Sequence, residues 1–354
     1  MSINMTIRKP VGLCEKGRRA NNEDSMYPTL DEGTVEDRLF IVCDGVGGAA
    51  KGDVASKIAC ETFSNLFQKA TISDPHFVES ALKKVEDRFQ EYTENNPNAA
   101  GMGTTLTLLH LHNNGATVAH IGDSRIYQIR NGQILYRSED HSYVQDLVKS
   151  GIISPEQART HPKRNVITRA IQGNLHRTQA DTYIIQDIQA GDYFFLCSDG
   201  ILESITDQQL CMLLTESMDN EQKIKEINTL CETQSRDNYT CYLIEIEDCT
   251  GNIDDESIAH PPSVIPSGVY FNKGNVMNTP SSIVEIDNRD DAVTLITPIQ
   301  SSRFKQAQSK PPLQTNIEKK EAPSIQQTNY WLWILIGGLF GFIIYKVIVY
   351  ILGV

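Results

Sequence analysis

The pattern of apolar and polar residues predicts short strands along the first part of the chain. Two apolar runs, Leu39–Cys43 and Tyr193–Cys197, are rich in β-branched or aromatic residues, and each is followed within two residues by an Asp-Gly pair. Runs of this length and composition, ended by turn residues, indicate buried strands. Asn131-Gly132 predicts a tight hairpin, because both residues tolerate positive φ. Further strands are expected at 104–112, 116–121, 126–130 and 133–137.

Helical periodicity occurs in blocks that are separate from these strands. Within 75–92, apolar residues recur at spacings of three and four, so that one face of the helix is apolar. Similar spacing predicts helices at 53–68, 208–215 and 221–232. Consecutive strands with helices in separate blocks favour an α+β fold, in which helices cover antiparallel sheets.

The carboxyl-terminal part differs in composition from the globular part, 1–249. Residues 250–328 are rich in Pro, Ser, Asn, Asp and Gln, which predicts a disordered linker. Residues 329–354 carry one charge, on Lys346, and a helix from Trp331 to Val354 would be about 36 Å long. Because a hydrocarbon core is about 30 Å thick, we expect a single transmembrane helix that anchors the chain by its tail; a buried core helix is the alternative.

The lysines around this segment predict the orientation of the chain in the membrane. Lys319 and Lys320 precede the apolar segment, whereas only Lys346 lies after its uncharged part. The positive-inside rule therefore favours a membrane protein whose globular body lies in the cytoplasm.

Charge and cysteine content narrow the class of protein further. A net charge of −13 over 354 residues argues against a protein that binds nucleic acid, since such proteins normally present a basic surface. The eight cysteines show no C-x-x-C pair and no zinc-site spacing. We interpret them as reduced core thiols of a cytosolic domain rather than as disulfides or metal ligands.

Acidic residues lie at the ends of several predicted strands. Asp44 and Asp199 end the two buried runs, and acidic clusters occur at 18–24, 121–125 and 236–240. Carboxylates gathered in one place repel one another unless a cation offsets their charge. Because the candidate ligands are all oxygen atoms, the pattern favours Mg²⁺ or Mn²⁺. Taken singly, each Asp-Gly pair is more typical of a turn.

The order of the motifs along the chain is specific. The series RxNNED, DGVGG, GTT, GDSR, EDHS, SDG and DN resembles the metal-dependent protein serine/threonine phosphatases of the protein phosphatase 2C family, in its bacterial form. The resemblance covers nearly all of residues 8–247, including HPKRNVITRAIQG at 161–173, which looks like the family's flap beside the site. It implies a four-layer α/β/β/α sandwich of two antiparallel sheets flanked by helices, with a metal site in a cleft at one end.

The resemblance implies a site with two or three Mn²⁺ or Mg²⁺ ions and assigns a role to each matched residue. Asp44 would bridge two ions, and the carbonyl of Gly45 would bind one of them. Asp199 and Asp237 would complete the shell of the other ion. Two ions that share a water lower its pKa and stabilise the attacking and leaving oxygens, so that no nucleophilic side chain is needed.

Four further positions match the same family. Glu23 and Asp24 would act mostly through water bound to the metal, and Asp123 with Asp199 would hold the third ion. Arg19 would bind the phosphate, because its planar guanidinium matches a phosphoryl group better than lysine does. The residues expected to be catalytic are thus Arg19, Asp44, Asp199 and Asp237.

The chain departs from the family at one place. Many relatives carry a histidine in or just after the first Asp-Gly motif as a candidate proton donor, whereas Val46 and Ala49 stand there in this chain. His141 and His161 are alternative donors, although a structural role is the stronger interpretation of each. A water bound to the metal is a further candidate for the general acid.

The leading hypothesis is an enzyme that hydrolyses phosphoserine and phosphothreonine on proteins and is tethered to the membrane. Its expected partners are phosphorylated proteins and a cognate Ser/Thr kinase, and its catalytic domain is expected to be monomeric. A membrane-anchored pseudophosphatase, which binds phosphoproteins without turnover, is the alternative from another class. A phosphatase for small metabolites uses the same chemistry at phosphorus, and the motifs leave it open.

Overall fold

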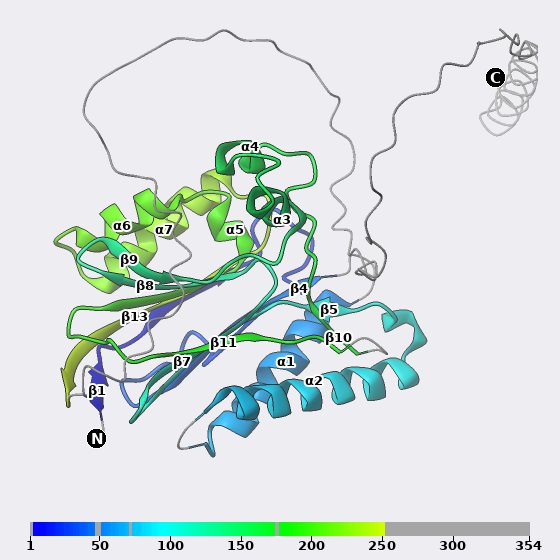
Figure 1. Cartoon of the computed structure of the whole chain (residues 1–354), viewed down its shortest axis with the longest axis horizontal. Coiled ribbons are helices and arrows are strands. Elements are labelled where there is room, and N and C mark those ends of the chain that lie inside the picture. The colour runs from blue at the N-terminus through cyan, green and yellow to red at the C-terminus, as the bar shows by residue number, and fades with distance from the viewer. Residues whose placement is uncertain (1–2, 47–50, 71–72, 174–176, 252–354) are drawn as a thin grey trace, which may run out of the picture. The chain divides into compact units, whose positions relative to one another are not determined.

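Two antiparallel sheets pack face to face, and helices cover their outer faces (Figure 1). The structure is a computed structural model that describes residues 3–46, 51–70, 73–173 and 177–251. The predicted linker and tail, 250–328 and 329–354, lie outside the described residues apart from positions 250 and 251. Among the helices that are described, none is both long enough and apolar enough for a membrane crossing.

The first sheet has 6 strands in the order β1-β13-β12-β8-β9, with β2 also paired to β13. All of its pairings are antiparallel. Its strands are β1 (Asn4–Ile7), β2 (Val11–Glu15), β8 (Arg125–Arg130), β9 (Gln133–Arg137), β12 (Tyr193–Cys197) and β13 (Tyr239–Thr250).

The second sheet has 7 strands in the order β10-β5-β4-β6-β7-β11, with β3 also paired to β4. It too is antiparallel at every pairing. Its strands are β3 (Asp24–Tyr27), β4 (Leu39–Val46), β5 (Gly103–Thr104), β6 (Leu106–His112), β7 (Gly115–Ile121), β10 (Ile171–Gln172) and β11 (Asp181–Ile185).

The helices fall into three groups, and only two of these cover a sheet (Figure 1). Helices α1 (Gly52–Phe67) and α2 (Pro75–Asn95) pack on the second sheet. Helices α5 (Asp199–Leu202), α6 (Asp207–Thr215) and α7 (Asn220–Gln234) pack on the first. Helices α3 (Tyr143–Lys149) and α4 (Pro155–Arg159) lie apart from the four layers, and a 3₁₀ turn follows α2 (Pro97–Ala99).

Alternate residues of the central strands supply three apolar cores. In β4, Phe40 and Val42 belong to the core between the two sheets, whereas Ile41 and Cys43 belong to the core under α1 and α2. Strand β12 alternates in the same way between the inter-sheet core and the core under α5, α6 and α7. Because both faces of these strands are buried, their sequences read as continuous apolar runs.

Most of the predicted elements are confirmed, including the hairpin between β8 and β9, where Asn131 and Gly132 have φ of 49° and 72°. The expected strand at 104–112 is divided at Thr105, whose amide donates to the carbonyl of Asp44 at 2.8 Å. Three short helices, α3, α4 and α5, were not predicted, since none is long enough to show an apolar period. The predicted four-layer arrangement is confirmed for the described residues.

Candidate metal centre

The ends of several strands meet at one end of the sandwich and carry the predicted acidic residues. In the second sheet, Asp24 at the start of β3 pairs with Asp44 near the end of β4. In the first sheet, Cys197 at the end of β12 pairs with Arg125 at the start of β8 and with Cys241 near the start of β13. Register therefore brings the residues beside these positions to the same end of the first sheet, namely Asp123, Asp199 and Asp237.

Both Asp-Gly pairs lie where backbone segments approach closely. A Cβ atom on Gly200 would lie 2.0 Å from the carbonyl oxygen of Asn238. One on Gly45 would lie 2.2 Å from the carbonyl oxygen of Gly52 and 2.6 Å from that of Glu23. Neither glycine is among the residues with positive φ, so these positions need glycine for space and not for a turn conformation. The predicted role of the Gly45 carbonyl as a metal ligand stays a prediction.

Ser198 connects the two sheets beside the carboxylates. Its hydroxyl donates to Asp24 Oδ2 at 2.8 Å and accepts from the Thr240 amide at 3.0 Å. The donor residue precedes α5, and the acceptor carboxylate lies on β3 of the other sheet. This bond fixes the carboxyl end of β12 against the start of β3.

Asn238 makes a second connection, and the sequence did not reveal it. Its Oδ1 accepts from the Glu23 amide at 2.8 Å, and its Nδ2 donates to the carbonyls of Lys16 at 2.7 Å and Asn21 at 2.9 Å. The amide therefore holds the RxNNED segment against the start of β13. The only sequence signal was its place beside Asp237 in the DN motif.

Burial and mutual repulsion raise the pKa values of the gathered carboxyl groups. For Asp44 and Asp199, burial comes first and repulsion from the neighbouring acids follows, and the pKa of each lies well above its ordinary value. Burial, with smaller contributions from other acids, raises the pKa of Asp24 and of Asp123 to about 7. The pKa of Glu23 is raised by burial and by Asp53. The ionised cluster therefore needs positive charge close by.

The carboxylates fit a divalent cation. Asp24 Oδ1 and Asp199 Oδ1 are buried and have no hydrogen-bond partner in the part of the chain that the structure describes. A buried carboxylate oxygen without a donor is costly, and a cation would satisfy it. The donors are oxygen atoms of several aspartates, a set that suits Mg²⁺ or Mn²⁺.

Arg19 lies beside the carboxylates, where the phosphate-binding residue was expected. Its Nη2 donates to Asp237 Oδ2 at 2.7 Å, and its side chain is 42% exposed. The bond to Asp237 raises the pKa of Arg19, and the negative charges of Asp199 and Asp44 raise it further. The guanidinium is thus both next to the site and open to solvent, as contact with a phosphoryl group requires.

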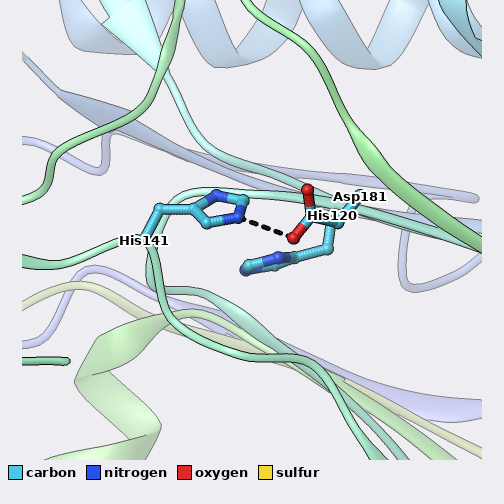
Figure 2. A group of neighbouring side chains, drawn as sticks. All are labelled: His120, His141 and Asp181. Atoms are coloured by element: carbon cyan, nitrogen blue, oxygen red, sulfur yellow. Dashed lines mark hydrogen bonds and ion pairs between the residues drawn. The ribbon is translucent and has the colours of Figure 1, made fainter. Parts of the chain in front are cut away.

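A group of three side chains lies close to this centre and has the spacing of a metal site (Figure 2). His120, His141 and Asp181 place ligand atoms within 4.8 Å of one another. His120 is 1% exposed, and burial lowers its pKa to about 3, so its ring is neutral. Neither of its ring nitrogens has a hydrogen-bond partner among the described residues.

The hydrogen bonds of His141 argue against a metal ion in this group. Its Nδ1 accepts from the Gly122 amide at 3.0 Å, so in the neutral ring the proton is on Nε2, which lies 3.0 Å from Asp181 Oδ2. A metal ion needs a free lone pair, and Arg169 Nη1 already lies 2.8 Å from Asp181 Oδ1. We interpret His141 and Asp181 as a hydrogen-bond network that holds Gly122, the residue before Asp123, and the ring of His120 packs against that of His141.

The two histidines considered as proton donors have structural surroundings. Both ring nitrogens of His141 are engaged, as described above. His161 is half-buried, its Nδ1 accepts from the Lys163 amide at 3.1 Å, and its ring lies 6.0 Å from that of Tyr143. The structural interpretation of His141 is therefore supported. A water bound to the metal as general acid stays a prediction, and position 49 lies outside the described residues.

Comparison with known families supplies the identity of the fold. The sequence profile described as Protein phosphatase 2C matches residues 16–233. The chain belongs to the protein phosphatase 2C family. The predicted family, a family of protein phosphatases, is thus confirmed.

Two similar proteins that are named as serine/threonine phosphatases are bacterial. The serine/threonine protein phosphatase PstP of Mycobacterium tuberculosis is 33% identical over 231 residues, which are 65% of this chain and 43% of PstP. The chain thus matches less than half of the length of that relative. The serine/threonine phosphatase stp of Listeria welshimeri is 31% identical over 238 residues, 65% of this chain and 93% of its own length.

Solved structures show the same fold for this protein phosphatase 2C domain. The crystal structure of M. tuberculosis PstP/Ppp aligns with a TM-score of 0.62 and 31% identity, over 69% of this chain and 100% of that one. The catalytic domain of PstP in complex with 2 manganese ions aligns with a TM-score of 0.60 and 29% identity, over 69% and 100% of the two chains. The metal in that structure, manganese, is one of the two metals, Mn²⁺ and Mg²⁺, that were predicted as cofactors for this chain.

Proposed function

We propose that this protein hydrolyses phosphoserine and phosphothreonine on other proteins and that the reaction depends on Mn²⁺ or Mg²⁺. The observation that carries the proposal is the meeting of acidic side chains from both sheets around an exposed arginine. Arg19 Nη2 lies 2.7 Å from Asp237 Oδ2, and the negative charges of Asp199 and Asp44 raise the pKa of Arg19. The family match and the named phosphatases among the relatives support it.

Each part of the site has a separate task in this mechanism. Asp44, Asp199 and Asp237 would hold two ions, and Asp123 with Asp199 a third. When bound, such ions supply a Lewis acid that lowers the pKa of water and neutralises phosphoryl oxygens. Arg19 binds and orients the phosphoryl group through its planar fork of donors.

The residues around the ligands hold them in position. Ser198 and Asn238 cross-link the two sheets, so that ligands from distant parts of the sequence keep a fixed separation. Such prior organisation is what a site for in-line displacement needs, because the attacking and leaving oxygens must both be placed.

The full chain in detergent tests this proposal with a phosphoserine or phosphothreonine peptide as substrate. Phosphate release is expected with Mn²⁺ or Mg²⁺ and is expected to stop in chelator. Asp199→Asn or Asp237→Asn should lower kcat by more than about 100-fold, since each removes one anionic ligand. Release in chelator at the full rate would contradict the proposal. Tight peptide binding without turnover would support the pseudophosphatase instead, and turnover of small phosphate esters alone would support a metabolite phosphatase.

We further propose that the carboxyl-terminal segment anchors the protein in a membrane with the catalytic body in the cytoplasm. The support is the composition of residues 329–354, which carry one charge, and of the polar segment 250–328 before it. Substrates would then be phosphoproteins at the membrane, phosphorylated by a cognate Ser/Thr kinase. Extraction by alkaline carbonate, or membrane retention after deletion of 329–354, would contradict the anchor. Protease protection of the body in sealed inverted vesicles would contradict the orientation.

A further inference from the structure

A groove leads away from the metal centre towards the two short helices outside the four layers. It is a cavity of about 580 Å³, and Asp123 and Asp199 are among the residues that line it. Residues of α3, α4, α5 and the start of α6 line much of the rest, together with residues of β8, β9, the end of α7 and the segments that connect these elements. In Figure 1, α3 and α4 lie near the end of the sandwich at which β4 ends. A peptide whose phosphorylated side chain reached the carboxylates would have this groove beside it.

Two of the five arginines that line the groove are neutralised. Arg125 forms a bidentate pair with Asp140, with Nε to Oδ1 at 2.6 Å and Nη2 to Oδ2 at 2.7 Å. Arg137 Nη1 lies 2.5 Å from Asp207 Oδ2. Both guanidinium groups are thus already ion-paired with aspartates of the same domain.

The other three arginines of the groove form no salt bridge among the described residues. Arg159, Arg164 and Arg236 are exposed, and none has a carboxylate within 4.0 Å of its guanidinium in the described part of the chain. Glu203 accepts from the backbone amide of Arg236 at 2.8 Å and not from its side chain. A chain with a net charge of −13 thus places three unpaired positive groups beside its metal centre.

Apolar residues separate these charges along the groove. Val144, Val148, Pro155 and Leu202 line it together with the arginines. This mixture suits an extended peptide better than a compact anion, because apolar atoms can contact the peptide between the charged positions.

We infer that the groove selects phosphoproteins that carry a second anionic group near the phosphorylated residue. The inference rests on the proposed function, since it assigns the substrate class of that same site. Guanidinium groups bind carboxylates and phosphates with the same two-pronged geometry, so Asp, Glu or a second phosphorylated residue would serve. The three arginines Arg159, Arg164 and Arg236 are the specificity-determining residues.

Four synthetic phosphopeptides test this inference with the full chain in detergent and Mn²⁺. They carry one phosphoserine flanked by alanine, by Asp and Glu, by a second phosphoserine, or by lysine. An exposed ion pair contributes about 1.4- to 5-fold, so two such pairs predict a kcat/KM about 2- to 25-fold higher for the anionic peptides than for the alanine peptide. Comparison of the two anionic peptides shows whether the groove prefers carboxylate or phosphate.

The variants Arg159→Gln, Arg164→Gln and Arg236→Gln, singly and combined, should bring the anionic-to-alanine ratio of kcat/KM towards one. Arg8→Gln is the matched control, because Arg8 is exposed and does not line the groove, and it should keep the ratio. In the unmodified chain, the ratio should also fall as NaCl is raised, a readout that needs no variant.

An unchanged ratio in the triple variant, or an equal or higher kcat/KM for the lysine peptide, would overturn the inference. Absence of turnover for all four peptides would instead overturn the proposed function, so the two failures are distinguishable.

Discussion

Replacing Gly200 with alanine is expected to separate Asp199 from Asp237. The new Cβ would lie 2.0 Å from the carbonyl oxygen of Asn238, a backbone atom that cannot rotate away. Side-chain Cβ atoms essentially never come within 3.0 Å of another heavy atom, so the two segments must move apart by about 1 Å. Metal sites tolerate deviations of about 0.2 Å in ligand distance, so this movement is enough to spoil the site.

The expected cost in stability follows from the same contact. Overpacking of this kind costs about 1–3 kcal/mol of unfolding free energy, which corresponds to a Tm lowered by about 2–12 °C for a domain of this size. The Mn²⁺ concentration for half-maximal activity is expected to rise by at least about 10-fold, as for loss of a residue that supports a metal ligand.

Thermal unfolding and Mn²⁺ titration of phosphopeptide hydrolysis measure the two effects. Gly33→Ala is the matched control, because Gly33 also lacks a positive φ and its Cβ would meet Pro10 Cγ at 3.3 Å and the nearest backbone atom, the Pro10 carbonyl oxygen, only at 3.9 Å. The control should keep the parent Tm and Mn²⁺ dependence. A Gly200→Ala variant that behaved like this control would refute the account of the second Asp-Gly motif.

Three further outcomes are expected. Arg19→Ala should raise KM for phosphopeptide by about 10- to 150-fold, because the guanidinium meets the phosphate, and an unchanged KM would count against that role. His141→Ala should raise the half-activating Mn²⁺ concentration by about 10-fold or more, because the Gly122 amide loses its acceptor beside Asp123; an unshifted titration would contradict this. In chelator, Tm should fall as pH rises from about 5 to about 8, since Asp24 and Asp123, with pKa values near 7, hold protons that the unfolded chain has released. Saturating Mn²⁺ should remove that trend in differential scanning fluorimetry.

Local pattern predicted strands β4, β6 to β9 and β12 and the four longer helices, because their signals are contained in a few neighbouring residues. Apolar content alone was enough to predict the strands at 39–43 and 193–197, and Asn131-Gly132 alone was enough to predict the hairpin. Helices α3, α4 and α5 were missed, because 7, 5 and 4 residues are too few for an apolar face to show. Strand β13 was missed although it pairs with three other strands.

The site was predictable in its ligands but not in what holds them. Ordered acidic motifs identified the carboxylates, because the chemistry of a cation site restricts the residue types. Ser198 and Asn238 act on partners 174 and 215 residues away, Asp24 and Glu23, and no local pattern records such a contact. The reason for the glycine after each aspartate also depends on distant contacts, because a Cβ atom at either place would meet the backbone of another segment.

Division of the ligands between the sheets links cation binding to folding of the whole domain. Asp24 and Asp44 belong to the second sheet, whereas Asp199 and Asp237 flank strands of the first. With no cation bound, docking of the sheets brings buried carboxylates together against their repulsion, which is why the pKa values of Asp44 and Asp199 are raised. A cation that binds only the docked arrangement stabilises both sheets at once, because it has no comparable site in the unfolded chain. Chelation should therefore lower the stability of the domain as one unit and not loosen the site alone.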